Sequence, residues 1–214
     1  MRRLMDIGGA VILGLLLAPV LLAVYLLVLL TMGRPVFFRQ RRVGQHGKIF
    51  EVRKFRTMYA EQYSGQADAA RTSTVGRLLR ASSLDELPQL WNVLRGEMSL
   101  IGPRPTLPEQ VAWYSDRQRG RLAVRPGLTG WAQVNGRNSI GWPERIELDL
   151  WYIENRCLAL DVQILGRTVK SVLSRRGIVG AGGVNPGFPT PRSQVDIALG
   201  TLLGGTVTEM ETEG

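Results

Sequence analysis

The chain has 214 residues, 44% of them hydrophobic, and carries 27 Lys and Arg against 18 Asp and Glu, a formal charge of +9. This length suits one domain with a substantial core, the apolar content excludes a disordered basic tail, and the charge favours anionic partners such as nucleic acid, phosphorylated metabolites or a lipid surface. A single cysteine, Cys157, and a single histidine, His46, exclude an internal disulfide and a Cys or His metal cage, so a catalytic metal would take oxygen ligands, as Mg²⁺ does.

The N-terminal segment 7–33 contains no charged residue. As a straight helix its 27 residues would reach roughly 40 Å, enough to cross a hydrocarbon core of about 30 Å, and the run is too long for a signal peptide. Pro19, which follows Ala18 in the middle of the run, predicts a break that leaves two arms, 7–18 and 20–32. Each arm would reach only about 18 to 20 Å, too short to cross.

Basic residues flank the apolar segment on both sides, and positive charge prefers the cytoplasmic side of a membrane. Both ends therefore favour the same compartment. The pattern fits a re-entrant helix-break-helix that dips into one leaflet, and it also fits a kinked spanning helix. With either topology, we expect the rest of the chain to face the cytoplasm.

Residues 34–57 hold eight basic residues against one acidic residue, Glu51. Apolar and basic residues alternate there, which predicts two short strands joined by a turn at 44–47. The apolar positions of this pattern are Val36, Phe38, Ile49, Val52 and Phe55. Such a hairpin would rest on anionic lipid headgroups, the role we favour for 39–42, or form one wall of a phosphate-binding site.

The rest of the chain predicts several helices. Residues 59–72 indicate a loop, followed by a helix with Val75, Leu78 and Leu79 on one face and a second helix that Gly96 closes. Further helices are expected at 107–119, 143–155 and 160–176. The last is amphipathic and basic, and suits either a membrane interface or the surface of a core. From residue 180 onward the composition predicts a poorly ordered tail without chemistry.

Two adjacent carboxylates, Asp85 and Glu86, lie at the expected start of the helix that Gly96 closes. Ser83-x-x-Glu86 is a capping box, which by itself accounts for acidic residues in a first helical turn. The functional alternative is that amides at a helix start also stabilise a phosphate, so that the pair supplies a nucleophile and a base or metal ligand. In a basic protein such a pair is a natural seat for one Mg²⁺ shared with a diphosphate.

Arg80, Arg104 and Arg137 each adjoin a turn or a Gly/Pro-rich segment where the backbone can approach a ligand. Guanidinium groups suit phosphate oxygens, although each of these residues could equally be a solvated arginine. The chain has no dinucleotide-binding glycine fingerprint, no nucleophile elbow and no zinc-peptidase motif. Nucleotide-dependent redox chemistry, serine hydrolysis and zinc peptidase activity are therefore not expected.

Four segments in a fixed order carry more information than any one motif. They are RRLMD before the proline-broken helix, FRQRRVGQHGKIFEVRKFRTM at 38–58, LLRASSLDELPQLWNVLRGEMSLIGPRP at 78–105, and VRPGLTGWAQVNGRN at 124–138. Together they resemble the small monotopic phosphoglycosyl transferases of bacteria, the sugar transferase family that starts glycan assembly on a polyprenol carrier. The resemblance covers residues 1–178. The chain departs from the pattern at Ala18-Pro19, where many relatives have Ser-Pro, and at Glu97, where aspartate is more usual.

The resemblance implies transfer of a sugar phosphate from a UDP-sugar to polyprenol (undecaprenyl) phosphate, with release of UMP and with Mg²⁺ as cofactor. It assigns to Asp85 the role of a nucleophile that forms a covalent phosphosugar-aspartate, and we expect the same carboxylate to hold the metal. Glu86 would activate the polyprenol phosphate or assist at the metal. The residues it assigns to substrate binding are Arg80, Pro103, Arg104, Pro105 and Arg137.

The expected fold is α+β and mainly helical, with a re-entrant membrane helix at 1–33 broken at Ala18 and Pro19, a compact catalytic domain at 34–178 that includes interfacial helices, and a tail at 179–214. The expected location is the cytoplasmic face of the bacterial inner membrane. Membrane lipids and downstream glycosyltransferases are the implied partners, and nucleic acid is not.

The competing hypothesis is a membrane-tethered basic module that binds nucleic acid, for which the charge of +9 is the motive. It predicts salt-dependent binding to oligonucleotides and no metal-dependent turnover. Its weakness is that the positive charge gathers beside the apolar segment, as it would on a surface that faces lipid.

Overall fold

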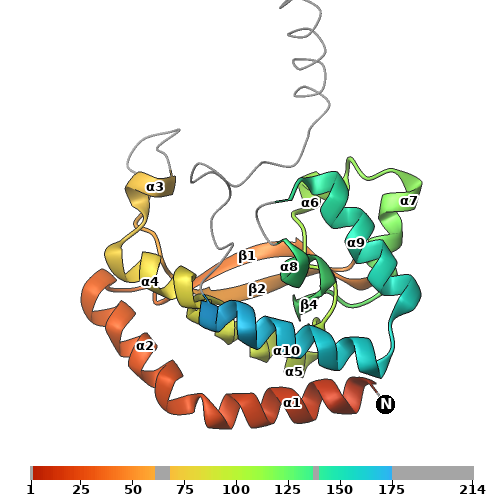
Figure 1. Ribbon diagram of the computed structural model, residues 1–214. Helices are drawn as coiled ribbons and strands as arrows, with labels where there is room; N and C mark the ends of the chain where they lie inside the picture. The colour runs from red at the N-terminus through yellow and green to blue at the C-terminus, as the bar shows by residue number, and fades with distance from the viewer. Residues whose placement is uncertain (1, 61–67, 137–139, 175–214) are drawn as a thin grey trace, which may run out of the picture.

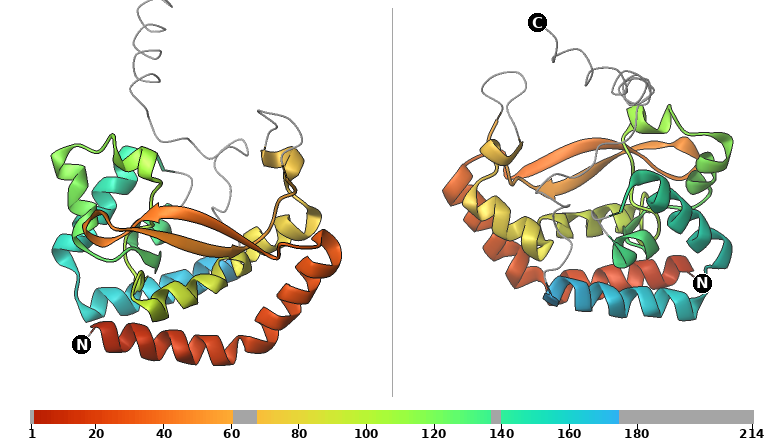
Figure 2. Two further views of the ribbon diagram at one scale, coloured as in Figure 1. Left: turned by 180° about the vertical axis from the view of Figure 1, so that it is seen from behind. Right: turned by 45° about the horizontal axis from the view of Figure 1, so that its top comes forward.

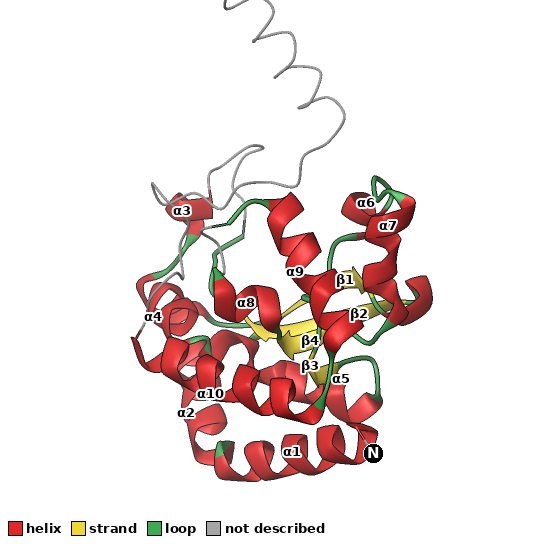
Figure 3. Cartoon of the chain, turned by 45° about the vertical axis from the view of Figure 1, so that its right-hand side comes forward, coloured by secondary structure: helices red, strands yellow, loops and turns green. Residues whose placement is uncertain are grey.

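The computed structural model describes residues 2–60, 68–136 and 140–174, and it confirms an α+β fold dominated by helix. Two small two-stranded sheets lie among the helices (Figure 3). The elements in chain order are α1 (Arg2–Leu16), α2 (Ala18–Met32), β1 (Phe37–Val43), η1 (Gln45–Gly47), β2 (Ile49–Phe55), α3 (Asp68–Arg71), α4 (Thr74–Ser82), η2 (Leu84–Gln89), α5 (Leu90–Arg95), β3 (Ser99–Ile101), α6 (Pro108–Val111), α7 (Asp116–Arg119), η3 (Gly120–Ala123), β4 (Gly127–Thr129), α8 (Trp131–Asn135), α9 (Trp142–Asn155) and α10 (Leu158–Ser174), where η marks a 3₁₀ helix.

Helices α1 and α2 form a bent arm beneath the rest of the molecule (Figure 1). They meet at Leu17 with a bend of 63°, and Ala18 and Pro19 form the first turn of α2, where the missing N–H of proline removes no helical hydrogen bond. The first arm thus ends at Leu16, two residues earlier than expected. Among the described residues no unbroken helix has the length and hydropathy needed to cross a membrane, whereas the bent pair taken together does meet those criteria.

Arginine side chains tie both arms to the rest of the fold. Arg3 of α1 donates hydrogen bonds to the carbonyls of Val93 and Leu94, 2.6 and 2.8 Å away, at the C-terminal end of α5. Arg56, just after β2, donates in the same way to the carbonyl of Gly33 at the end of α2, 2.8 Å away. Since the last carbonyls of a helix lack intrahelical partners, each arginine satisfies a helix end and fixes the arm.

The opposite face of the arm is apolar and exposed. Leu4, Leu15 and Leu30 keep 74%, 72% and 83% of their surface accessible. Exposure of large aliphatic side chains over two whole helices is far more than the isolated apolar residues normal on a soluble surface.

Strands β1 and β2 form the predicted antiparallel hairpin, with Phe37 paired to Phe55 and Val43 to Ile49, and η1 makes the predicted turn. Of the five alternating apolar residues, Val36, Val52 and Phe55 are buried, whereas Phe38 and Ile49 are about half exposed. Strand face does not separate the two groups, because the buried Phe55 shares a face with Ile49, and the buried Val52 shares the other face with Phe38. The buried residues are those that helices cover: Phe55 packs in a core cluster with Val28 and Leu79, and Val52 packs in another with Leu90 and Val93.

The parallel pair β3 and β4 brings two Gly-rich segments together. Gly102, directly after β3, donates its N–H to the carbonyl of Thr129, and Gly127 donates to the carbonyl of Pro103, both at 2.9 Å. A Cβ atom on Gly127 would stand 2.1 Å from the backbone nitrogen of Gly102, so only glycine permits this approach.

The segment around Ser83 differs from the expectation. Ser83 has a positive φ of 59° and ends α4 as a left-handed residue, and its side chain makes no capping hydrogen bond, so the predicted capping box is wrong. The next six residues form the 3₁₀ helix η2 before α5 begins at Leu90. Leu79 of α4 is buried, but Leu78 is 63% exposed and does not share its buried face.

The remaining helices partly follow the expectations. The helix predicted at 107–119 is two four-residue helices, α6 and α7, and the loop predicted at 59–72 contains the short helix α3. Helix α9 matches the helix predicted at 143–155. The amphipathic helix α10 begins at Leu158 and lies alongside α1 in two views (Figures 1 and 2), where an ion pair of 3.1 Å joins Arg2 to Asp161. The predicted tail at 179–214 lies outside the described residues.

Candidate active site

The Asp85-Glu86 pair lies on η2, which packs against strand β2. The left-handed turn at Ser83 ends α4 and reverses the chain so that the first turn of η2 meets the strand. Asp85 is 8% exposed. Two acidic side chains are thus held against a basic strand rather than presented to solvent, as they would be in a surface capping box.

Glu86 is the centre of an ion cluster. Its Oε1 atom lies 2.6 Å from Nζ of Lys54 on β2 and 2.5 Å from Nη2 of Arg104, and Nη1 of Arg104 donates to Oε2 at 3.1 Å. Burial alone would raise the pKa of Glu86, but the charges of Arg104 and Lys54 and their hydrogen bonds outweigh it and hold that pKa far below its usual range. Glu86 is therefore ionised and fully engaged by its two cations.

The Asp85 carboxylate has the opposite character. Across the described ranges it accepts no side-chain or backbone hydrogen bond and makes no ion pair. Burial first, and the neighbouring charge of Glu86 second, raise its pKa to about 6, against the attraction of Lys54, Arg104 and Arg80. A buried carboxylate that has no partner in the described part of the chain and a raised pKa is available to a ligand, as a nucleophile or as a metal ligand.

Arg80 contributes to this environment from the last turn of α4. Its Nε atom donates to Oγ1 of the buried Thr57 at 3.0 Å, which fixes the side chain near η2. The charge of Arg80 acts on Asp85 without a direct ion pair. The structure therefore brings four predicted residues together, namely Arg80, Asp85, Glu86 and Arg104, while Arg137 lies outside the described residues.

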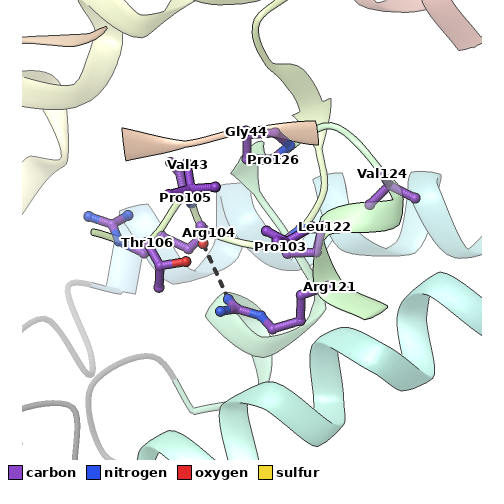
Figure 4. A pocket seen from close by; sticks show the side chains of 10 residues that line it. All are labelled: Val43, Gly44, Pro103, Arg104, Pro105, Thr106, Arg121, Leu122, Val124 and Pro126. Atoms are coloured by element: carbon purple, nitrogen blue, oxygen red, sulfur yellow. Dashed lines mark hydrogen bonds between the residues drawn. The ribbon is translucent and has the colours of Figure 1, made fainter. Parts of the chain in front are cut away.

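Pro103 and Pro105 flank Arg104 in the loop after β3. Both prolines are buried and line a small cavity with Val43 and Leu122 (Figure 4). The cavity measures about 10 Å³, which is room for about one water molecule and too little for a nucleotide. This position favours a role for the prolines in shaping the loop that presents Arg104, rather than direct contact with a substrate.

Two further residues belong to the candidate site, Lys54 and Arg42, which the sequence pattern indicates only as members of the basic hairpin. Both lie on the strand face that carries Val52 and that looks toward η2. Arg42 donates to the carbonyl of Pro105 at 3.1 Å, and burial first, then the charge of Arg104, lowers its pKa to about 10. The expected lipid-facing role is therefore wrong for Arg42. The signal that could have found both residues is the two-residue period itself, since positions 42 and 54 share one face in the hairpin register.

The site fits one divalent cation but not a protein-only cage. Within the described part of the chain no three His, Cys, Asp or Glu side chains come close enough to hold a metal ion. Glu86 is occupied by Lys54 and Arg104, and Asp85 is the carboxylate that remains available. Mg²⁺ is commonly held by one or two carboxylates together with substrate phosphates and water, and this donor set suits that mode.

Basic side chains surround a buried aspartate that has no partner among the described residues, and this arrangement defines a candidate group-transfer site. The model of a family described as bacterial sugar transferase matches residues 1–175, and the chain belongs to that family. It is 46% identical over 181 residues to an uncharacterized sugar transferase, EpsL, of Bacillus subtilis, which covers 83% of this chain and 90% of the relative.

Two further relatives carry functional names. The chain is 42% identical over 188 residues to a UDP-glucose:undecaprenyl-phosphate glucose-1-phosphate transferase of Caulobacter vibrioides, covering 81% of this chain and 70% of that protein. It is 37% identical over 199 residues to an undecaprenyl-phosphate galactose phosphotransferase of Salmonella typhimurium, covering 83% of this chain but 41% of that protein. The chain thus spans less than half of the Salmonella relative.

Proposed function

We propose that this protein transfers a sugar 1-phosphate from a UDP-sugar to undecaprenyl phosphate and releases UMP, as the first membrane step of a bacterial polysaccharide or glycoconjugate. The observation that carries the proposal is the buried Asp85 carboxylate, which has no hydrogen-bond or ion-pair partner within residues 2–60, 68–136 and 140–174 and lies beside the Glu86–Lys54–Arg104 ion cluster. Family membership and the names of the relatives support this transfer over the binding of nucleic acid.

The proposed reaction has two displacements at one phosphorus atom. In the first, a carboxylate oxygen of Asp85 forms a bond to the sugar-bearing phosphorus, the bond from that phosphorus to the bridging oxygen breaks, and UMP leaves with that oxygen. In the second, a phosphate oxygen of undecaprenyl phosphate attacks the same phosphorus and the Asp85–phosphorus bond breaks. The two steps return the aspartate unchanged and yield undecaprenyl diphosphate sugar.

The positive side chains of the site would lower the cost of bringing a carboxylate to a diphosphate. Arg104 and Arg80 place two guanidinium groups near Asp85. Fixed charges of this kind stabilise the charge that develops on the phosphoryl oxygens and need no rearrangement during the reaction. Because its pKa is so low, Glu86 is a weak proton acceptor, and its geometry favours a role in holding Lys54 and Arg104 over a role as general base.

We also propose that the reaction depends on Mg²⁺, for which Asp85 is the protein ligand in the described site and the donor phosphates supply further oxygens. When bound, the cation would neutralise charge on the diphosphate and so make the leaving UMP more stable. Removal of divalent cations by a chelator should therefore stop UMP release, and Mg²⁺ should restore it.

The placement that we propose is monotopic, on the cytoplasmic face of the inner membrane. The exposed apolar face of α1 and α2 supports this placement, and so do the basic residues that follow α2. Helix α10 would lie in the same interface, because Leu158, Val162, Leu165 and Val169 form an exposed apolar stripe along it. This arrangement would give the active site access to a phosphate whose polyprenol tail stays in the bilayer.

The decisive experiment uses the full chain in lipid nanodiscs with undecaprenyl phosphate, Mg²⁺ and a panel of UDP-sugars. We expect UMP release with one or a few donors and no release with D85N. Protein quenched with the donor alone should gain the mass of one sugar phosphate on the peptide that contains Asp85. Turnover by D85N at the wild-type rate would refute the aspartyl intermediate, and absence of UMP release with every donor would refute the proposed reaction.

A further inference from the structure

The loop that presents Arg104 is held at three successive carbonyl groups. The carbonyl of Pro103 accepts a hydrogen bond from the N–H of Gly127 at 2.9 Å, and that of Pro105 accepts one from Nη1 of Arg42 at 3.1 Å. Between them, the carbonyl of Arg104 accepts one from Nη2 of Arg121 at 3.2 Å (Figure 4). Donors from three separate elements thus fix three residues in a row.

The Arg121 side chain, which makes the second of these contacts, is itself held by two other side chains. Arg121, on η3, is 4% exposed, and its Nε and Nη2 atoms lie 3.0 and 2.6 Å from Oδ2 of Asp149 on α9. Its Nη1 atom donates to the hydroxyl of Tyr114. One guanidinium group therefore donates hydrogen bonds to a carboxylate, a phenol and the loop carbonyl at once. Its rigid, planar set of donors makes this possible.

The buried Arg121–Asp149 ion pair has a high desolvation cost, so stabilisation of the fold alone does not account for it. Both partners of the Arg121–Asp149 pair are almost wholly buried, and Oδ1 of Asp149 has no hydrogen-bond partner among the described residues. Burying an ion pair costs desolvation energy that the attraction often fails to recover, and an unpartnered buried oxygen adds to the cost. What the pair does secure is a single orientation of the guanidinium group, with one donor aimed at the backbone of Arg104.

We propose that Arg121 is a positioning residue for the transfer reaction. It fixes the backbone of Arg104 so that the Arg104 side chain forms its ion pair with Glu86, beside Asp85. The inference rests on the proposed function and adds a positioning residue that lies outside the four sequence segments on which the resemblance depends. Arg121 itself contacts neither Glu86 nor Asp85, so it acts through Arg104. Asp149 and Tyr114 in turn hold Arg121, and Asp149 connects α9 to the active site.

The test substitution is R121K. A lysine ammonium keeps the positive charge beside Asp149, but it cannot also serve Tyr114 and the Arg104 carbonyl. Loss of a hydrogen bond from a charged donor predicts a rise of about tenfold in KM for the UDP-sugar. In addition, the acid limb of the pH–rate profile should move to higher pH, because a displaced Arg104 leaves more of the Glu86 charge to act on Asp85.

The matched control is R117K. Arg117 on α7 pairs with Glu147 on α9 at 2.7 Å, so this pair joins the helix that precedes η3 to α9, but it is exposed and makes no hydrogen bond to the Arg104 loop. We expect R117K to keep the wild-type KM and the wild-type pH profile. Wild-type values for R121K, or equal changes in the two variants, would overturn the inference.

A double substitution separates positioning from a general loss of stability. If Arg121 acts through Arg104, R121K should raise KM little further in an R104K background, whereas independent effects would multiply. Multiplying effects would overturn the inference.

Should R121K fail to fold, Y114F provides a second test, because it removes one partner of Arg121. Y114F should shift KM and the acid limb in the same direction as R121K, and an unchanged profile would overturn the inference. Absence of UMP release by the wild type would instead refute the proposed function itself.

Discussion

Asp85 and Glu86 are neighbours in the chain, yet their carboxylates meet opposite surroundings. Glu86 receives hydrogen bonds from Lys54 and Arg104, while Asp85 receives none from the described residues. The pKa of the first is far below its usual range, and that of the second is raised to about 6. Two identical functional groups thus lie in opposite electrostatic environments, as in sites where two carboxylates perform different roles.

The first prediction concerns the pH dependence of the reaction. Asp85 can attack phosphorus only as a carboxylate, so kcat/KM for the UDP-sugar should rise with pH through about 6 and level off above about 7. UMP release measured between pH 5 and 8 at fixed Mg²⁺ would show this limb. Because Mg²⁺ bound at Asp85 would itself lower the pKa, a limb near pH 4 that does not move with the Mg²⁺ concentration would mean that burial and Glu86 do not act on Asp85 as the structure indicates.

The second prediction is that D85N stabilises the protein above pH 6. The pKa of Asp85 in the folded state lies above its ordinary value of 3.8, so folding disfavours the ionised form, and stability falls as the pH rises through about 6. Asparagine removes that penalty. D85N should therefore exceed the wild type by up to about 3 kcal/mol at pH 8, with the difference shrinking toward pH 4. Thermal unfolding in one detergent across this range measures it.

The control for that experiment is D116N. Asp116 lies exposed in the first turn of α7, away from the ion cluster. Its substitution should change Tm by a similar small amount at every pH above 5. An equal stability of D85N and the wild type at pH 8 would contradict the raised pKa of Asp85.

The third prediction concerns Lys54. K54M leaves Glu86 with one cation instead of two and removes an attractive charge near Asp85. The acid limb of kcat/KM should move to higher pH, and the rate at pH 7 should fall by about tenfold or more. R53M is the matched control, because Arg53 directly precedes Lys54 on β2, lies on the opposite face of the strand and lines a separate cavity with Trp91. Equal losses in K54M and R53M would refute a specific role for Lys54.

The sequence could predict the features that depend on neighbouring residues, but not the contacts between residues that are distant in the chain. The arm break near Pro19, the hairpin turn at 44–47 and helix α9 depend on local signals, a proline, a glycine pair and a helical period, and the structure contains all three. The pairing of Lys54 with Glu86 joins residues 32 positions apart. No local pattern encodes such a contact, because it depends on how η2 packs on β2.

The error at Ser83 has a physical cause as well. The Ser-x-x-Glu spacing fits a capping box, but Pro88 lies inside the expected helix and lacks the N–H that a regular α-helical turn would use. The segment 84–89 forms a 3₁₀ helix instead, Ser83 becomes the end of α4, and Glu86 is freed to meet Lys54 and Arg104. The structure therefore contradicts the capping box as the explanation of the two acidic residues, because the Ser83 side chain makes no capping hydrogen bond.

The fourth prediction is that substitution of Glu86 shifts the pH profile in the direction opposite to substitution of Lys54. E86Q removes the like charge beside Asp85, so the pKa of Asp85 should fall and the acid limb of kcat/KM should move to lower pH, opposite to K54M. The rate at pH 7 should still drop, because Lys54 and Arg104 lose the anion that orients them. E144Q, an exposed position at the start of α9, serves as control. Limbs that move in the same direction in E86Q and K54M would contradict the charge balance described for this site.

The fifth prediction concerns the bent arm. If α1 and α2 dip into one leaflet and return, a tag on the N-terminus, a cysteine at position 34 in a C157S background, and the native Cys157 should all lie on one side of a sealed vesicle. Cys157 is exposed and suits labelling with a membrane-impermeant maleimide. A cysteine at Leu17, the point of the bend, should stay unlabelled from both sides, because it would lie among lipid tails. An N-terminal tag on the side opposite to Cys157 would instead show a kinked helix that spans the membrane, and would overturn the monotopic placement while leaving the chemistry of Asp85 intact.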